Sequence, residues 1–212
     1  MKAVFTVGAI AVALGVTACA RPRAGALEGD LAPERSLPAI ELAAGHRRVV
    51  FRWDYEENAL IARGEGAMRI AAPDSARVDL FLAGGIPVGR AVLIGDEIKS
   101  TSQPQVERFL PPPALMWAAL GRLAIPPLPD TVITVEGELM HADIGRPTAW
   151  RVTIKGTRLM RLARLSSGRI AEVVTRDDGG RLLYEVPGRR KLWLGIIRDE
   201  EVQPFDASIW GP

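Results

Sequence analysis

The residue types that most often carry protein chemistry are scarce in this 212-residue chain. It contains one cysteine, Cys19, and two histidines, His46 and His141. One cysteine forms no internal disulfide, and this set is too small for a cysteine-rich metal site or for histidine-based catalysis. We therefore expect no metal site and no cofactor. The role of Cys19 must follow from its place near the N-terminus.

The other polar patterns do not assemble into a catalytic motif. The serine pair at 166–167 has no histidine nearby in the sequence. The acidic pairs at 56–57 and 200–201 are sequence neighbours, which point to opposite faces of a strand, whereas a glycosidase needs two facing carboxyl groups. Gly64 and Gly66 lack the third glycine and the helix of a dinucleotide site, and they favour a close approach to the backbone. We expect a protein that is not an enzyme.

Composition and charge indicate one ordinary globular domain. The chain is 48% hydrophobic, and 27 Lys and Arg residues against 25 Asp and Glu residues leave a formal charge of +2. This balance of charges is not the signature of a nucleic-acid-binding protein. Separately, we expect the protein to be a monomer. Residues 151–198 carry 12 Lys or Arg against 4 Asp or Glu. That local excess fits either solvated strand faces or a surface for anionic lipid headgroups.

An uncharged run from Ala3 to Ala18 precedes the cysteine. It is too short to span a bilayer comfortably but is typical of a signal-peptide core. The sequence Val16–Cys19 resembles the lipobox of bacterial lipoproteins, which implies cleavage after Ala18 and a lipid-anchored Cys19. A signal peptide without lipidation, or a signal anchor, is the alternative. We assign 1–18 to the signal peptide, 19–35 to the lipidated cysteine and a flexible tether, and 36–212 to the folded domain.

Local patterns predict two helices. Ser36 as N-cap, Pro38 in the first turn and Gly45 as a stop favour a short helix over Leu37–Ala44. A second helix is predicted over Pro112–Ala124, opened and closed by prolines and apolar nearly all round. We expect this helix either to pack on a sheet or to cover an apolar cavity.

Alternation of apolar and polar residues predicts strands in most of the remaining chain. Links of hairpin length favour a single antiparallel sheet. The ten expected strands are Val49–Glu56, Leu60–Ile70, Arg77–Ala83, Arg90–Ile94, Thr131–Met140, Ala149–Gly156, Thr157–Leu165, Arg169–Arg176, Arg181–Val186 and Lys191–Arg198.

The order of these segments resembles the superfamily of LolA- and LolB-type periplasmic lipoprotein carriers and receptors. Supporting features are the lipobox, Leu60–Pro73 leading into Ala76–Leu82, the Leu120–Gly121 pair near the helix end, and Pro204–Phe205 near the C-terminus. The resemblance implies a mainly β, α+β fold. In it, a single curved antiparallel sheet forms a half-barrel, and helices plug its concave side over an apolar cavity for acyl chains.

Apolar residues on the expected strands and on the second helix are the candidate cavity lining. They are Phe51, Trp53, Leu80, Leu82, Leu93, Leu115, Trp117, Leu120, Trp150 and Trp193. The wholly uncharged hairpin tip at 84–89 carries Ile86 and Val88. The resemblance implies that these two side chains touch the acceptor membrane, and the alternative is a tip folded onto its own sheet.

These features lead to one functional expectation and one alternative. The resemblance implies a lipoprotein in the cell envelope, at the outer membrane facing the periplasm, that binds the acyl chains of a lipid or lipoprotein cargo. The cargo would pass to the membrane, and a soluble periplasmic donor is a possible partner. Alternatively, the chain is a structural or assembly lipoprotein that binds a protein partner and fills the cavity with its own helix.

Overall fold

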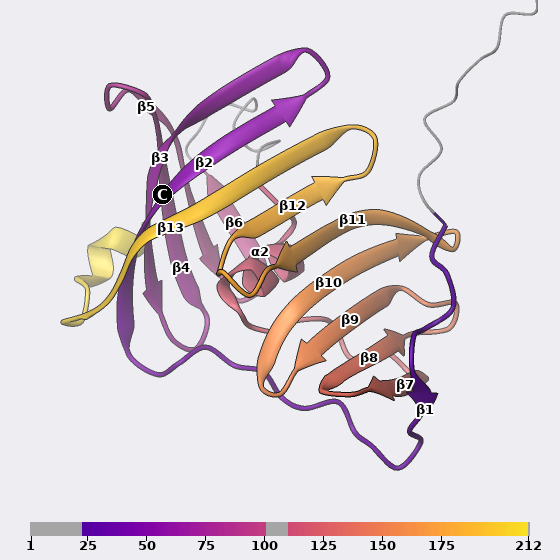
Figure 1. The fold of residues 1–212 in the computed structure, drawn as a ribbon. Coiled ribbons are helices and arrows are strands. Elements are labelled where there is room, and N and C mark those ends of the chain that lie inside the picture. Colours follow the sequence, from indigo (N-terminus) through magenta and orange to yellow (C-terminus); the bar gives the residue numbers. More distant parts are fainter. Residues whose placement is uncertain (1–22, 101–109, 212) are drawn as a thin grey trace, which may run out of the picture.

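The computed structural model describes residues 23–100 and 110–211. Their 13 strands form one continuous antiparallel sheet that curves around the helix α2 (Figure 1). All ten expected segments form strands, so the prediction of a single curved antiparallel sheet is confirmed. The three further strands are two short edge strands and one that arises because the chain turns at Gly137. The segment expected to be a signal peptide and Cys19 lie outside the described residues.

The sheet has the strand order β1-β7-β8-β9-β10-β11-β12-β13-β2-β3-β4-β5-β6. In chain order the strands are β1 (Asp30–Leu31), β2 (His46–Glu57), β3 (Leu60–Ala71), β4 (Ser75–Leu82), β5 (Pro87–Ile94), β6 (Glu97–Ser100), β7 (Thr131–Glu136), β8 (Leu139–Ile144), β9 (Trp150–Lys155), β10 (Arg158–Ser166), β11 (Arg169–Arg176), β12 (Leu182–Val186) and β13 (Arg190–Val202).

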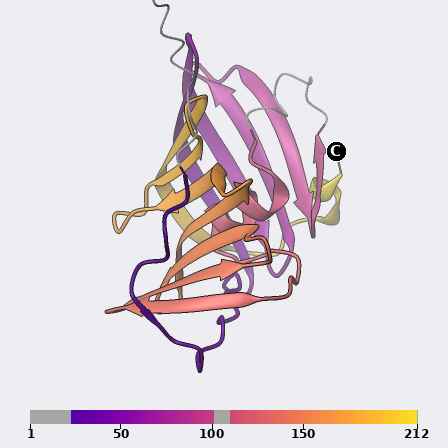
Figure 2. The ribbon, with the colours of Figure 1, turned by 90° about the vertical axis from the view of Figure 1, so that its right-hand side faces the viewer.

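The centre of the sheet is the pairing of the last strand with the second. β13 runs antiparallel to β2 along its whole length, from Arg190 opposite Glu57 to Val202 opposite His46. This pairing joins the meander β2–β6 to the meander β7–β12. The two meanders therefore form one surface with one inner face, which is the face toward α2 (Figure 2).

Period-2 alternation decides which side chains reach the inner face. In β2, Val49, Phe51, Trp53 and Tyr55 are buried, while Arg52 and Asp54 between them are exposed on the outer face. The inner-face residues of all the central strands join the helix in one hydrophobic core. A 3-10 helix, η1 (Ala207–Trp210), packs on the outer face of β4, where Arg77 donates to the Ile209 carbonyl.

The described residues contain a single α-helix, α2 (Pro113–Leu120). It is shorter than the predicted Pro112–Ala124 because Gly121, at φ 97°, takes the left-handed conformation and caps it. The Gly121 amide donates to the Ala118 carbonyl, and the next amide donates to that of Trp117. We expected two helices on the concave side of the sheet, and the described residues form one α-helix there, α2.

The predicted helix over Leu37–Ala44 is wrong. These residues form no helix, and Leu37, Ile40 and Leu42 instead pack against the core from an irregular segment. The Ile40 carbonyl accepts a hydrogen bond from the Leu123 amide at 2.9 Å. A tertiary contact to the chain that follows α2 has thus outweighed the local capping signals.

The segment expected to be a flexible tether is attached to the sheet from Arg23 onward. Arg23 forms an isolated bridge with Arg169, and the Ala24 amide donates to the Gly168 carbonyl. Further along, β1 pairs with β7. We call residues 23–31 the N-terminal strap. Figure 1 shows it in indigo across β7–β11, on the outer face.

Candidate functional site: an apolar cavity under the helix

A small apolar cavity lies between the inner face of the sheet and α2. Its walls come from β2, β3, β4, β5, β11, β12 and β13, from the helix, and from the Leu110–Pro111 segment. The lining residues are Phe51, Trp53, Tyr55, Met68, Val78, Leu80, Val88, Leu110, Pro111, Met116, Ala119, Leu120, Val174, Leu182, Tyr184, Leu192 and Leu194. The cavity volume is about 60 Å³, which is smaller than the ~150 Å³ cavity that admits benzene.

The glycines of β3 let two aromatic rings lie flat against the sheet. A Cβ at Gly66 would stand 2.3 Å from the Phe51 ring, and one at Gly64 would stand 2.9 Å from the Trp53 ring. The Trp53 indole also donates to the Glu65 carbonyl at 3.0 Å, which fixes its orientation. Gly64 and Gly66 therefore permit a close approach of the rings that form the cavity floor.

The helix that forms the cavity roof is anchored on its far side. Trp117 is 1% exposed, and its indole donates to the Gly95 carbonyl at 2.6 Å. At the C-terminal end, the Arg176 guanidinium donates to the Ala119 carbonyl at 2.7 Å. Met116, Ala119 and Leu120 face the cavity, whereas Trp117 holds the helix in place.

The polar groups of the lining are fixed by two carboxylates. The Tyr55 hydroxyl donates to Glu57 at 2.6 Å, and Arg190 donates to the same carboxylate at 3.0 Å. These bonds, with Arg189 close by, lower the pKa of Glu57 to about 2. The Tyr184 hydroxyl donates to Glu172 at 2.9 Å.

A more open, polar hollow lies next to the apolar cavity. It is lined by Ile98, Leu110, Pro111, Pro112, Glu172, Tyr184 and Arg190. Leu110, Pro111 and Tyr184 line both spaces, so the two spaces adjoin at these residues. Burial, together with Glu172, raises the pKa of Tyr184, so its hydroxyl remains a donor across the physiological range. An apolar space with a charged, hydrogen-bonding neighbour suits an amphipathic ligand.

Four of the ten residues predicted to line the cavity do so. They are Phe51, Trp53, Leu80 and Leu120. Leu93 and Leu115 are fully buried in the core outside the lining. Trp117 and Trp150 line a groove on the other side of α2, and Leu82, 37% exposed, lines an outer groove beside its hairpin.

Trp193 is a correction to the predicted lining. Its neighbours Leu192 and Leu194 line the cavity, so Trp193 points to the outer face, where it is 36% exposed and lies near Lys191. Residue type alone favours Trp193, whereas the alternation of β13 favours its two neighbours. That alternation was the signal for Leu192 and Leu194, which the sequence analysis missed.

The two apolar residues predicted at the hairpin tip, Ile86 and Val88, lie in different environments. Ile86 is 59% exposed at the turn between β4 and β5, where its carbonyl accepts from the Leu82 amide. Val88 belongs to β5 and lines the cavity. The neighbouring β2–β3 hairpin exposes Leu60 and Ile61 at the start of β3, which sequence reasoning missed. The apolar surface at this end of the sheet thus comes from two hairpins.

Several basic residues in 151–198 are paired with carboxylates, either on the outer face of the sheet or, for Arg190, with the buried Glu57. Arg151 binds Asp143 at 2.7 Å, Arg164 binds Glu172 at 2.7 Å, and Arg189 and Arg190 both bind Glu57. This pairing favours the solvated-face explanation of the local charge excess over a headgroup-binding surface.

Comparison with solved structures identifies the fold. No protein-family model matches this chain, and no curated protein matches it significantly. A LolA superfamily protein from Nitrosomonas europaea superposes with a TM-score of 0.54 at 9% identity, over 82% of this chain and 93% of that one. A DUF1329 family protein from Desulfovibrio piger gives a TM-score of 0.44 at 7% identity, over 79% and 90% of the two chains. A putative outer membrane lipoprotein-sorting protein domain from Vibrio parahaemolyticus gives 0.37 at 6% identity, over 79% and 89%.

The first of these similarities shows that the chain has a LolA-like fold, as the sequence resemblance predicted. Its low identity shows the fold alone. In the described part of the chain, we find no helix long and apolar enough to cross a membrane.

Proposed function

We propose that this protein is a lipid-anchored carrier or receptor of the bacterial envelope, and not an enzyme. It would hold the acyl chains of a lipid or lipoprotein cargo between α2 and the inner face of the sheet. The anchor would be an acylated Cys19 in the outer membrane, facing the periplasm. In the lipoproteins that the N-terminus resembles, aspartate after the acylated cysteine disfavours transfer to the outer membrane; Ala20 stands there in this chain and leaves that destination open.

The observation that carries this proposal is the apolar cavity with its polar neighbour. The lining holds only two hydroxyl groups, those of Tyr55 and Tyr184, and both donate to carboxylates. Acyl methylenes are favoured in such an environment by roughly 0.8 kcal/mol each. A headgroup can lie in the hollow of Glu172, Tyr184 and Arg190 while the chain enters the cavity.

Uptake requires the protein to exchange its own contacts for those of the cargo. A space of about 60 Å³ does not hold an acyl chain. The half-buried side chains of Leu110 and Leu120, which line it, are the ones to move outward. Because Trp117 and Arg176 anchor the helix on its far side, opening at Leu110 and Pro111 costs fewer hydrogen bonds than removing α2.

Transfer needs no nucleotide hydrolysis if affinity rises along the route. A soluble periplasmic protein would give up the cargo, this protein would bind it more tightly, and the membrane would receive it. The exposed Ile86 at the β4–β5 turn would touch that membrane.

The small cavity also supports the second candidate, an assembly lipoprotein that binds a protein partner. In that case Met116, Ala119 and Leu120 fill the inner face permanently. The two candidates differ in whether the cavity opens.

The test compares a cavity-filling variant with a matched surface variant. Full-length protein is incubated with a lipopeptide that carries one photoreactive acyl chain, and crosslinks are mapped by mass spectrometry. We expect crosslinks to cavity residues, lost in Ala119→Phe and kept in Ala207→Phe, which adds the same ring at an exposed site in η1. Absence of crosslinks in the unsubstituted protein, or equal labelling of both variants, would favour the assembly lipoprotein.

A further inference from the structure

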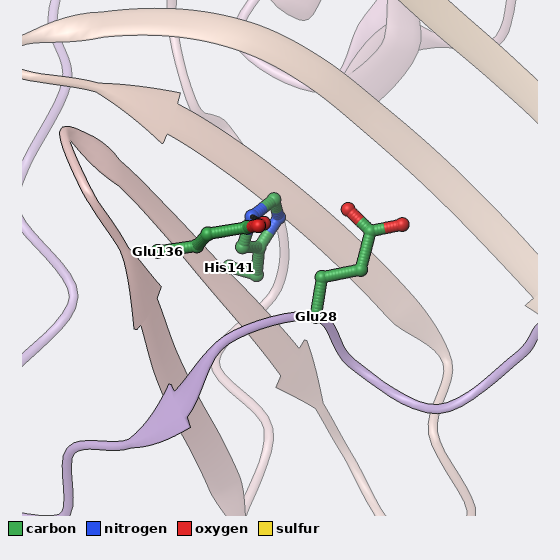
Figure 3. Close-up of side chains that lie close together, drawn as sticks. All are labelled: Glu28, Glu136 and His141. Carbon is green, nitrogen blue, oxygen red and sulfur yellow. Dashed lines mark ion pairs between the residues drawn. The ribbon is translucent and has the colours of Figure 1, made fainter.

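Three potential metal ligands from separate parts of the chain meet on the outer face of the sheet. Glu28, Glu136 and His141 each offer one ligand atom, and these atoms lie within 4.8 Å of one another. Figure 3 shows the Glu136 side chain running to the His141 ring, with Glu28 extending from the strap beside them. None of the three belongs to the cavity.

The sheet register brings the three residues together. His141 in β8 lies opposite Thr134 in β7, so Glu136, two residues further along β7, is its diagonal neighbour on the same face. Glu28 lies in the strap just before β1. Its carbonyl accepts a hydrogen bond from the Thr134 hydroxyl, which fixes its backbone above β7.

His141 supplies the observation that points to a ligand. The residue is 7% exposed, and its Nδ1 lies 3.1 Å from the Thr153 hydroxyl. Its Nε2 is buried and has no hydrogen-bond partner among the described residues. The nearest Glu136 oxygen is 4.0 Å away, which is too far for a hydrogen bond. A buried ring nitrogen without a partner is costly and calls for an occupant.

We propose that Glu28, Glu136 and His141 bind one divalent transition-metal ion, of which Zn²⁺ fits best. Imidazole with two carboxylates is a donor set that Zn²⁺ accepts, and a water completes the tetrahedron. The Thr153 hydroxyl orients the ring through Nδ1 and leaves Nε2 for the ion, as second-shell partners of metal-binding histidines do. This proposal does not depend on the function proposed for the cavity.

The geometry needs only a small contraction. Ligand atoms around tetrahedral Zn²⁺ are about 3.3 Å apart for bonds of about 2.0 Å. Both carboxylates are exposed on long side chains, so a rotamer change closes the gap from 4.8 Å. The two negative charges offset the ion. Two arginines interact electrostatically with Glu28. They are Arg151, which is also paired with Asp143, and Arg161.

Binding would fasten the strap to the β7–β8 hairpin. Glu28 comes from the strap, whereas the other two ligands come from the hairpin. The ion would therefore stabilise the short β1–β7 pairing, in which only Asp30 and Leu31 take part.

The experiment titrates full-length protein with ZnCl₂ by calorimetry at neutral pH. The protein is purified without a histidine tag, and Cys19→Ser is present in every sample to remove the thiol. We expect one ion per chain, and at least ~100-fold weaker binding in His141→Gln, Glu28→Gln and Glu136→Gln. Glu138→Gln, exposed in the β7–β8 turn, and His46→Gln are the matched controls and should bind like the parent.

The exposed glutamates make the test independent of whether His141→Gln folds. Unchanged binding in both Glu28→Gln and Glu136→Gln would overturn the proposal, as would the lack of saturable binding at ~100 µM Zn²⁺. As an independent readout, we expect the Ala32 amide, which donates to the Ile133 carbonyl next to β1, to exchange ~100-fold more slowly at a hundredfold excess of Zn²⁺ over its Kd.

Discussion

The inner face under α2 and the outer face under the N-terminal strap are covered by different means. On the inner face, Phe51, Trp53 and the residues of α2 contact one another mainly through apolar surface. On the outer face, the strap is held mostly by specific polar bonds, such as those of Thr134 to Glu28 and of Arg151 to the Gly25 carbonyl. An apolar contact is non-directional, so a ligand can replace it. A polar bond at a fixed position needs a partner of matching geometry.

The largest expected effect separates two tryptophans on opposite faces. Trp117→Ala should lower the free energy of unfolding by ~3–5 kcal/mol, because it empties the core under α2 and removes the bond to Gly95. Trp193→Ala on the outer face should cost under ~1 kcal/mol. Urea unfolding measures both. Equal losses would show that α2 does not organise the inner face.

The next effect tests the polar end of the inner face. Glu57→Gln should cost ~1.5–3 kcal/mol, because Tyr55 and Arg190 lose a charged acceptor. The pKa of Glu57 is lowered from 4.5 to about 2 in the folded state. Its stabilising contribution is therefore present above pH 4.5 and is lost as the pH falls through about 2. Between these pH values, the midpoint of thermal unfolding should depend less on pH in Glu57→Gln than in the parent. Glu56→Gln, which changes the exposed neighbour, is the control and should behave like the parent. The same pH dependence in all three proteins would contradict this role of Glu57.

A smaller effect belongs to the strap. Thr134→Val keeps the shape of a buried residue but removes its bond to the Glu28 carbonyl, at a cost of ~1 kcal/mol. Because this bond holds only the strap, we expect the Ala32 amide, which donates to the Ile133 carbonyl, to exchange ~5-fold faster and the core amides to be unaffected. Hydrogen exchange measures this difference. Uniformly faster exchange would mean that strap and core open together.

The substitution with the smallest expected effect on stability, Ile86→Glu, should clearly slow the delivery of acylated cargo to a membrane. Ile86→Glu changes an exposed side chain and should alter stability by less than ~0.5 kcal/mol. If Ile86 touches the acceptor membrane, the variant should bind the acylated cargo normally but release it to vesicles more slowly. Ile197→Glu, exposed in β13, is the matched control. Delivery that is unchanged in Ile86→Glu would remove this turn from the mechanism.

The sequence predicted local structure well where one periodicity dominated. In β2 the alternation from Val49 to Tyr55 identified both the strand and its buried face. The same rule applied to β13 would have excluded Trp193 and selected Leu192 and Leu194. Residue type is a weaker guide than alternation in β13, because an aromatic side chain such as Trp193 can lie on the outer face.

The sequence could not predict contacts between residues that are distant in the chain. The pairing of β13 with β2 joins residues more than 130 positions apart, and alternation carries no information about which strands are neighbours. The same holds for Glu28, Glu136 and His141, whose spacing forms no metal-binding motif. The irregular segment around Ile40 shows the reverse case, in which a distant amide overrides a local helix signal.

The bridge between Arg23 and Arg169 limits how the protein can work at a membrane. Only three residues lie between Cys19 and Arg23, so an acylated Cys19 would tether the sheet through a segment of at most about 14 Å. Arg169 begins β11 at the same end of the antiparallel sheet as the β2–β3, β4–β5 and β12–β13 turns. The domain would therefore keep that end close to its own bilayer, and cargo would have to come to it.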